Sequence, residues 1–167
     1  MTSLEVLRIL HIVFGIYVAG SYLFIVPILE PRLKRLGPSI QGPVMNAIMP
    51  PLAVVNAISF IMLIGTGVAM TLIMRGGALN TLLTTAWGWV IILGLAATLG
   101  AAVVGFGFLI PTGISMDKLG RSIVGRPPSS DESKQLQQLS DRVGALSRGN
   151  FVLIVIALAA MIIARYV

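Results

Sequence analysis

The sequence predicts an all-α polytopic membrane protein: a bundle of four transmembrane helices, with a cytoplasmic amphipathic helix leading into the last span. Four apolar runs occupy most of the 167 residues, at about 4–29, 47–74, 86–110 and 150–165. The mean hydropathy is +0.95 and only 11% of residues are charged, so a water-soluble domain of this size has no means of hiding the apolar surface. Three runs exceed the roughly 20 residues that cross a ~30 Å hydrocarbon core. We therefore expect a single membrane domain over residues 1–167.

The first span is expected to begin almost at the first residue, because Thr2 followed by Glu5 is a capping-box pattern. Glu30-Pro31 is expected to end it, and the Gly- and Pro-rich stretch 37–43 to form a connection. The acidic Glu5 and the length of the apolar run do not fit a cleaved signal peptide. We therefore expect this span to remain in the mature protein.

The second span contains a seam of residues at three- and four-residue spacing that holds its strongly polar side chains. The seam consists of Met45, Met49, Leu52, Asn56, Ser59, Leu63, Thr66, Met70 and Met74. We expect it to face the bundle interior, with Asn56 in an interhelical hydrogen bond. Thioethers bind Cu(I), but methionine more often provides adaptable packing, and we adopt that interpretation. The span is expected to end at Arg75-Gly76-Gly77.

The third span begins with Trp87 and Trp89, at the depth where an aromatic belt belongs. Pro111 and Gly113 are expected to close it. Its small residues at a spacing of four predict a helix-packing face. These residues are Ala97, Ala101 and Gly105.

Residues 112–149 are expected to form a cytoplasmic loop and a polar helix. Ser130 before Asp131-Glu132 is a favourable helix start. An apolar stripe at helical spacing follows, formed by Leu136, Leu139, Val143 and Leu146. We expect one long helix over 131–165, with a bend or break at Gly144 or at Gly149-Asn150.

The basic residues are distributed unevenly about the spans, and the net charge is +6. Nine follow the first or third span: Arg32, Lys34, Arg35, Lys118, Arg121, Arg126, Lys134, Arg142 and Arg148. Three lie elsewhere: Arg8, Arg75 and Arg165. The positive-inside rule then predicts a multi-pass membrane protein whose loops after the first and third spans lie in the cytoplasm, with both termini outside. The charge serves topology and attraction to anionic lipids, at about 1 kcal/mol per residue, and nucleic acid is not an expected partner.

The spans offer little chemistry. Between the boundary positions of the spans there is no Asp, Glu, Lys or Arg, and the chain has one histidine and no cysteine. Ion-coupled transporters usually need an ionisable group at membrane depth, and no hydrolase motif is present. We therefore predict no catalytic residue and no metal site.

His11 is the candidate cofactor ligand. With Gly15 and Ala19 at a spacing of four, it places an imidazole above a groove of small residues that suits the edge of a tetrapyrrole. Arg8, one turn outward, would meet a haem propionate. In the alternative that we favour, Gly15 and Ala19 permit close packing, His11 hydrogen-bonds a neighbouring helix, and Arg8 snorkels to the interface.

Residues 7–20, Leu-Arg-Ile-Leu-His-Ile-Val-Phe-Gly-Ile-Tyr-Val-Ala-Gly, resemble the first span of the copper-resistance-D-like superfamily. Further likenesses are Thr66-Gly67, Pro111 and the polar helix before the fourth span. The resemblance implies a bacterial family of four-helix integral membrane proteins, and hence a location in the bacterial inner (plasma) membrane. Its relatives include a haem-dependent protoporphyrinogen oxidase, which implies a haem b ligand role for His11. The chain differs from that enzyme in having uncharged spans and no second histidine, so bis-His ligation would require a second subunit.

Three functions remain open on the sequence alone. The prediction that we carry forward is a non-catalytic accessory or anchoring subunit of a larger membrane complex, with the lipid bilayer and other membrane subunits or a second copy as partners. It follows from the small-residue faces and the missing catalytic groups. The alternatives are a haem b protein that uses His11, and a permease for a small solute or a metal.

Overall fold

The computed structural model describes residues 2–76, 80–123 and 125–167, and this part of the chain is helical, with no strand. Four helical segments are long and apolar enough to cross a membrane: Ser3–Leu36, Ile40–Met74, Ala86–Ser122 and Ser130–Ile163. Large apolar side chains cover their outer surface, such as Ile16 at 68% and Ile61 at 69% exposure, as expected where lipid is the solvent. The prediction of an all-α protein with four potential membrane-spanning helices is confirmed.

The first long helix consists of α1 (Ser3–Phe24), a five-residue π-helix η1 (Ile25–Leu29) and α2 (Glu30–Leu36). Its N-terminal capping box, between Thr2 and Glu5, forms as predicted. The expectation that Glu30-Pro31 ends the helix is wrong. The N–H of Glu30 bonds to the carbonyl five residues back, that of Ile25, and this wider turn accommodates the proline that follows.

The third long helix repeats this device. It consists of α5 (Ala86–Val104), the π-helix η2 (Gly105–Leu109) and α6 (Ile110–Ser122). The N–H of Ile110 bonds to the carbonyl of Gly105, immediately before Pro111. The prediction that Pro111 and Gly113 close the helix is therefore wrong.

Helix α3 spans Pro38–Arg75 and contains Pro43, Pro50 and Pro51. The predicted connection over 37–43 is wrong, because Gly37 alone, at φ 84°, separates α2 from α3. The helix ends at Arg75 as predicted, with Gly76 in the left-handed conformation at φ 55°. Gly77 lies outside the described residues.

Helix α7 spans Ser130–Ile163 without interruption. The side chain of Ser129 caps it by accepting from the N–H of Glu132. The predicted bend or break at Gly144 or Gly149-Asn150 is wrong. Gly144 and Asn150 are buried against neighbouring helices, so these residues serve close packing along a continuous helix.

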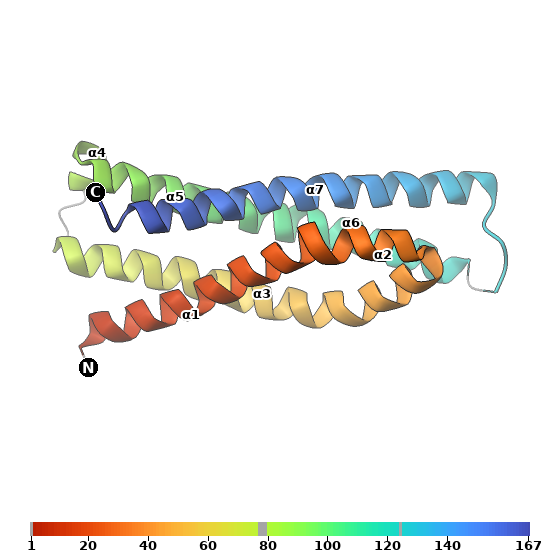
Figure 1. The fold of residues 1–167 in the computed structure, drawn as a ribbon, viewed down its shortest axis with the longest axis horizontal. Coiled ribbons are helices and arrows are strands. Elements are labelled where there is room, and N and C mark those ends of the chain that lie inside the picture. Colours follow the sequence, from red (N-terminus) through yellow and green to blue (C-terminus); the bar gives the residue numbers. More distant parts are fainter. Residues whose placement is uncertain (1, 77–79, 124) are drawn as a thin grey trace.

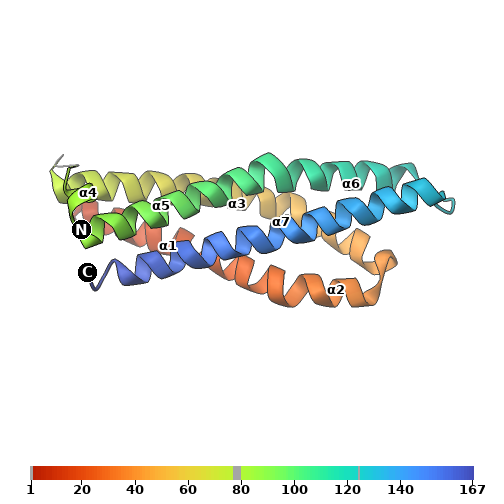
Figure 2. The ribbon, with the colours of Figure 1, turned by 90° about the horizontal axis from the view of Figure 1, so that it is seen from above.

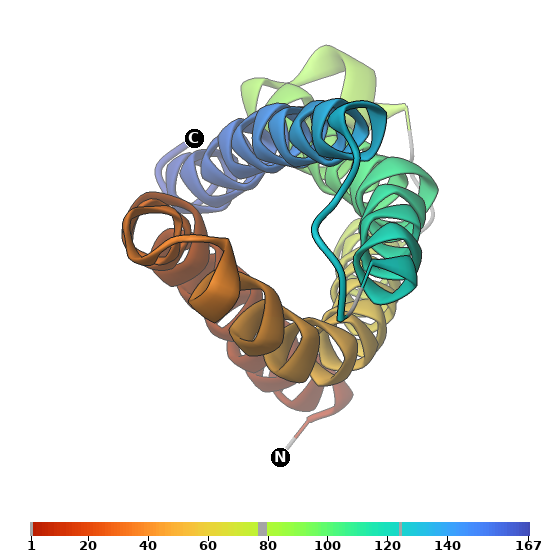
Figure 3. The same ribbon diagram turned by 90° about the vertical axis from the view of Figure 1, so that its right-hand side faces the viewer.

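The four long helices run up and down about a common axis. Figures 1 and 2 show both termini at one end, beside the short helix α4 (Thr81–Thr84), whereas the connections at Gly37 and at 125–129 lie at the opposite end. Seen along the axis, α1 packs against α3 and α7, and α5 packs against the same two helices (Figure 3). The first half of α7 packs on α6 and so continues the bundle.

Each long helix is longer than a hydrocarbon core requires. A segment of 34 residues is about 51 Å long at 1.5 Å per residue, roughly 20 Å more than the core. On the first, third and last of these helices the excess contains most of the charged residues of the chain. It lies at the end with the connections (Figure 1). We call the group formed by α2, α6 and residues 130–148 the polar extension.

Candidate functional site

The imidazole of His11 joins α1 to α3. Its Nδ1 lies 2.9 Å from Oγ1 of Thr66, and Thr66 is only 5% exposed. Gly67 leaves room for the ring, because a Cβ there would stand 3.2 Å from Cε1 of His11. The Thr66-Gly67 pair, noted in the sequence only as a point of likeness, is thus the surface on which His11 packs. The favoured prediction, a hydrogen bond between His11 and a neighbouring helix, is confirmed.

The hydrogen bonds of Thr66 assign the proton of His11. The Thr66 hydroxyl has one proton, which it donates to the carbonyl of Met62 one turn back. It therefore accepts from His11, whose Nδ1 carries the imidazole proton while Nε2 keeps its lone pair. A ligating histidine often has this arrangement, but it is equally what helix-to-helix packing needs.

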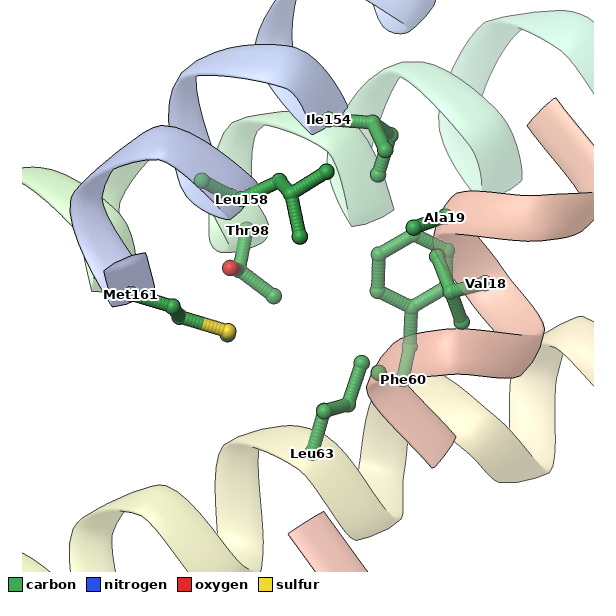
Figure 4. Close-up of a pocket in the computed structure, with 10 residues that line it drawn as sticks. Val18, Ala19, Phe60, Leu63, Thr98, Ile154, Leu158 and Met161 are labelled. Carbon is green, nitrogen blue, oxygen red and sulfur yellow. The ribbon is translucent and has the colours of Figure 1, made fainter. Parts of the chain in front are cut away.

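A small apolar cavity lies one turn deeper between the four long helices. Gly15, one turn from His11, and Leu63, one turn from Thr66, are part of its wall. Its volume is about 30 Å³. Figure 4 shows Met161 and Leu158 pointing into it from α7, and Phe60 and Leu63 from α3. The cavity also touches Val18, Ala19, Thr98, Ile154 and Ala157.

This cavity does not fit a haem. Sites for cofactors of that size occupy several hundred Å³, about ten times the volume of this cavity, and His11 is not among the residues that line it. The wall residue Thr98 donates its hydroxyl to the carbonyl of Gly94 on its own helix. Arg8 is exposed and is not brought to His11 by any hydrogen bond or ion pair among the described residues. Among the described residues, His11 and Arg8 therefore do not line a common cavity, and a haem-ligand role for His11 stays a prediction.

A second polar contact joins the first and last long helices. Nδ2 of Asn150 donates to the phenolic oxygen of Tyr22 at 2.8 Å, and Gly105 of η2 lies against both side chains. Asn150 is fully buried, and its Oδ1 has no partner among the described residues. The sequence indicated Asn150 only as a place for a bend, because nothing local to a residue reveals its partner on another helix.

The small-residue face of the third span packs against other helices of the same chain. Ala101 is completely buried and Ala97 is 5% exposed. At Gly94 on the same helix, a Cβ would stand 3.2 Å from Cβ of Ala160 on α7. This confirms the predicted packing face, and it also means that the face is already covered by the chain itself.

The seam of the second span faces inward where it was predicted to be most polar. Ser59 is fully buried, and Leu63 and Thr66 are at most 5% exposed. The predicted interhelical bond of Asn56 is marginal. Its Oδ1 lies 3.5 Å from the hydroxyl of Ser21, which already donates to its own helix.

A charged cluster lies where α2 meets α7, and the sequence analysis did not foresee it. The hydroxyl of Ser147 donates to the Glu30 carboxylate at 2.6 Å. Lys34 and Arg148 interact electrostatically with the same carboxylate. The i, i+4 spacing of Glu30 and Lys34 was the available signal, but their contact with α7 depends on the continuation of α2 beyond Pro31.

Fold and site together define a bundle of four helices with the length and composition of membrane spans, held together by buried polar pairs. Within the described residues, no three His, Asp, Glu or Cys side chains gather into a metal-binding group. Comparison with protein-family models, with curated proteins and with solved structures finds no match. The resemblance to the copper-resistance-D-like superfamily stays a prediction.

Proposed function

We propose that the chain is a non-catalytic accessory or anchoring subunit of a larger membrane complex. We call the rest of the bundle, outside the polar extension, the apolar half. It would hold the chain in the inner membrane of a bacterial cell, and the polar extension would present a rigid surface on the cytoplasmic side. The observation that carries the proposal is the polar extension itself. It exists because the long helices are roughly 20 Å longer than a ~30 Å core requires and stay helical over that excess.

The use of polar side chains supports an anchoring role. In the apolar half, His11 and Thr66 bind each other, as do Tyr22 and Asn150. Such pairs act as interhelical connections in a medium that offers them no other partner. These polar side chains of the bundle interior therefore connect the long helices to one another.

The charge of the polar extension supports the cytoplasmic orientation. Nine of the twelve Lys and Arg residues lie on it or on the connection before α7. The positive-inside rule places that end in the cytoplasm and the termini outside. A partner on this face would meet exposed polar side chains of α7, among them Lys134 and Gln138.

The alternatives receive less support from the geometry. A haem b role for His11 needs a pocket that the cavity of about 30 Å³ does not supply. A permease needs a path, and this cavity has an apolar lining apart from Thr98, whose hydroxyl is bonded to its own helix.

The proposal is tested by purifying tagged protein from native membranes after mild cross-linking, and measuring the size of the complex on native gels. The test variant is Lys134→Glu with Gln138→Glu, one turn apart on the exposed face of α7. The matched control is Val152→Ala with Val155→Ala, which are exposed on the apolar half of the same helix.

We expect a complex larger than the chain alone, retained by the control and lost by the charge variant. Wild-type protein that migrates as a monomer with no stoichiometric partner would refute the proposal. Loss of the partner in the control alone would place the interface within the membrane and refute the role of the polar extension.

A further inference from the structure

Two cationic side chains converge above a glycine at the junction of α2 and α7. If residue 144 had a Cβ, it would stand 3.3 Å from Nζ of Lys34 and 4.0 Å from Nη1 of Arg148. Gly144 itself is buried, whereas Lys34 and Arg148 are exposed and open to the surroundings. We call this place, formed by Lys34, Gly144 and Arg148, the basic notch.

The notch has a surplus of one positive charge. Glu30 is the acidic group beside it, and its carboxylate accepts from Ser147 at 2.6 Å while interacting electrostatically with both cations. Neither Lys34 nor Arg148 forms an ion pair within the described part of the chain. Two cations and one carboxylate therefore leave one charge that a monoanion would balance.

Because residue 144 has no side chain, both cationic groups lie close over the main chain of α7. The nearest atoms to the vacant Cβ position are the charged nitrogens themselves. A larger residue would push the Lys34 ammonium aside and fill the space between the two cations. Lysine and arginine at this spacing offer a phosphate several N–H donors, with the planar guanidinium able to bind two oxygens at once.

The depth of the notch points to the lipid headgroup layer. Lys34 lies about 46 Å along the first long helix from Ser3, and a bilayer with its headgroups is roughly 40–45 Å thick. A helix that starts at one surface therefore brings Lys34 to the phosphates of the opposite leaflet. Arg148 directly precedes the apolar run of α7 and lies at the same level.

We propose that the basic notch binds the phosphate group of an anionic phospholipid. A phosphodiester with a neutral headgroup supplies the single negative charge that the notch lacks. A zwitterionic lipid would bring an ammonium group next to Lys34 and leave the surplus charge uncompensated. The site does not depend on the proposed function, because it concerns the chain and its bilayer alone.

The test measures lipid binding to protein purified in a non-ionic detergent, by native mass spectrometry with phosphatidylglycerol against phosphatidylcholine. Lys34→Gln with Arg148→Gln removes both cations. Lys118→Gln with Arg142→Gln is the control, because it removes two exposed cations elsewhere on the polar extension. Gly144→Leu keeps all charges and fills the notch. A thermal melt of each variant verifies that it is folded.

We expect wild type and control to prefer phosphatidylglycerol by about 30-fold, as two surface cations imply. The double Gln variant and Gly144→Leu should bring the preference to about twofold or less. Equal preference in all four proteins would overturn the proposal. So would displacement of the lipid by sub-millimolar inorganic phosphate, because the natural occupant would then be a soluble anion. If Gly144→Leu does not fold, the double Gln variant decides the outcome alone.

Discussion

The amide of Asn150 donates to the hydroxyl of Tyr22 at 2.8 Å, joining the last long helix to the first beside the π-helix η2. Asn150 has no exposed surface, and its Oδ1 is unpaired among the described residues. A buried amide with one of its groups unsatisfied is costly, so loss of the bond to Tyr22 would leave its second group unsatisfied and add to that cost.

This relationship predicts non-additive effects of substitution. Tyr22→Phe removes the acceptor and strands the buried Asn150 donor, at a cost of about 1–3 kcal/mol. Asn150→Ala removes the whole amide, after which Tyr22→Phe should cost little more. Unfolding in mixed micelles should therefore give a coupling energy close to the whole cost of Tyr22→Phe, about 1–3 kcal/mol. Additive effects of the two substitutions would show that the bond does not contribute to stability.

The packing of His11 on α3 predicts opposite effects at two nearby glycines. Gly67→Ala would place a Cβ 3.2 Å from Cε1 of His11, and shifting the ring would lengthen its bond to Thr66. We expect a loss of about 1 kcal/mol or more. Gly65→Ala meets nothing within 4 Å and should be neutral or stabilising by up to about 1 kcal/mol. Thermal unfolding of both variants provides the measurement, and equal midpoints would contradict the proposed packing.

Gly88, in the first turn of α5, predicts a stronger effect of adding a side chain. The main chain of Leu82 in α4 lies directly against Gly88, where a Cβ would overlap it, and the Gly88 N–H is bonded to the side chain of Thr85. Gly88→Ala must therefore displace α4, and we expect a loss of about 1–3 kcal/mol. Gly20→Ala, in open space on α1, is the control for a Gly-to-Ala change in an apolar helix. A Gly88→Ala protein as stable as the control would show that α4 does not need this contact.

The sequence predicted the features that depend on composition and helical period. Hydropathy located the four long helices, and the three-four spacing of polar residues placed Ser59 and Thr66 toward the interior, where they are buried. The capping pattern at Thr2 also predicted where the first helix begins. The cap expected at Ser130 is one residue late, because the cap of α7 is Ser129 and the helix begins at Ser130. These signals are local, so a single sequence contains them.

The errors arose where tertiary packing overrides a local rule. Pro31 and Pro111 are helix-breaking signals in the sequence, yet each follows a π-turn whose hydrogen bond spans five residues and keeps the helix going. A glycine within a helix predicts a bend or break, but in the structure Gly144 packs closely beneath Lys34 and the helix is continuous. The partners of Tyr22 and Glu30 lie on a helix more than a hundred residues away, and no periodic pattern reveals them.

The polar extension makes a prediction about depth that follows from its place on α7. The chain has no cysteine, so single cysteines report accessibility without background. Ser133→Cys and Gln138→Cys lie on exposed positions of the polar extension, and Val152→Cys lies on the apolar half. A membrane-impermeant maleimide should label the first two only after the cells are permeabilised, because the positive-inside rule predicts that this end lies in the cytoplasm. Ser3→Cys, at the end with the termini, should react in intact cells. Val152→Cys should stay unlabelled in both, since a thiol in hydrocarbon reacts poorly with a polar reagent.

Two results would contradict this arrangement. Labelling of Ser133→Cys in intact cells would mean that the polar extension lies outside the cell. Rapid labelling of Val152→Cys would mean that residue 152 lies outside the hydrocarbon core, so that the membrane begins nearer the C-terminal end of α7.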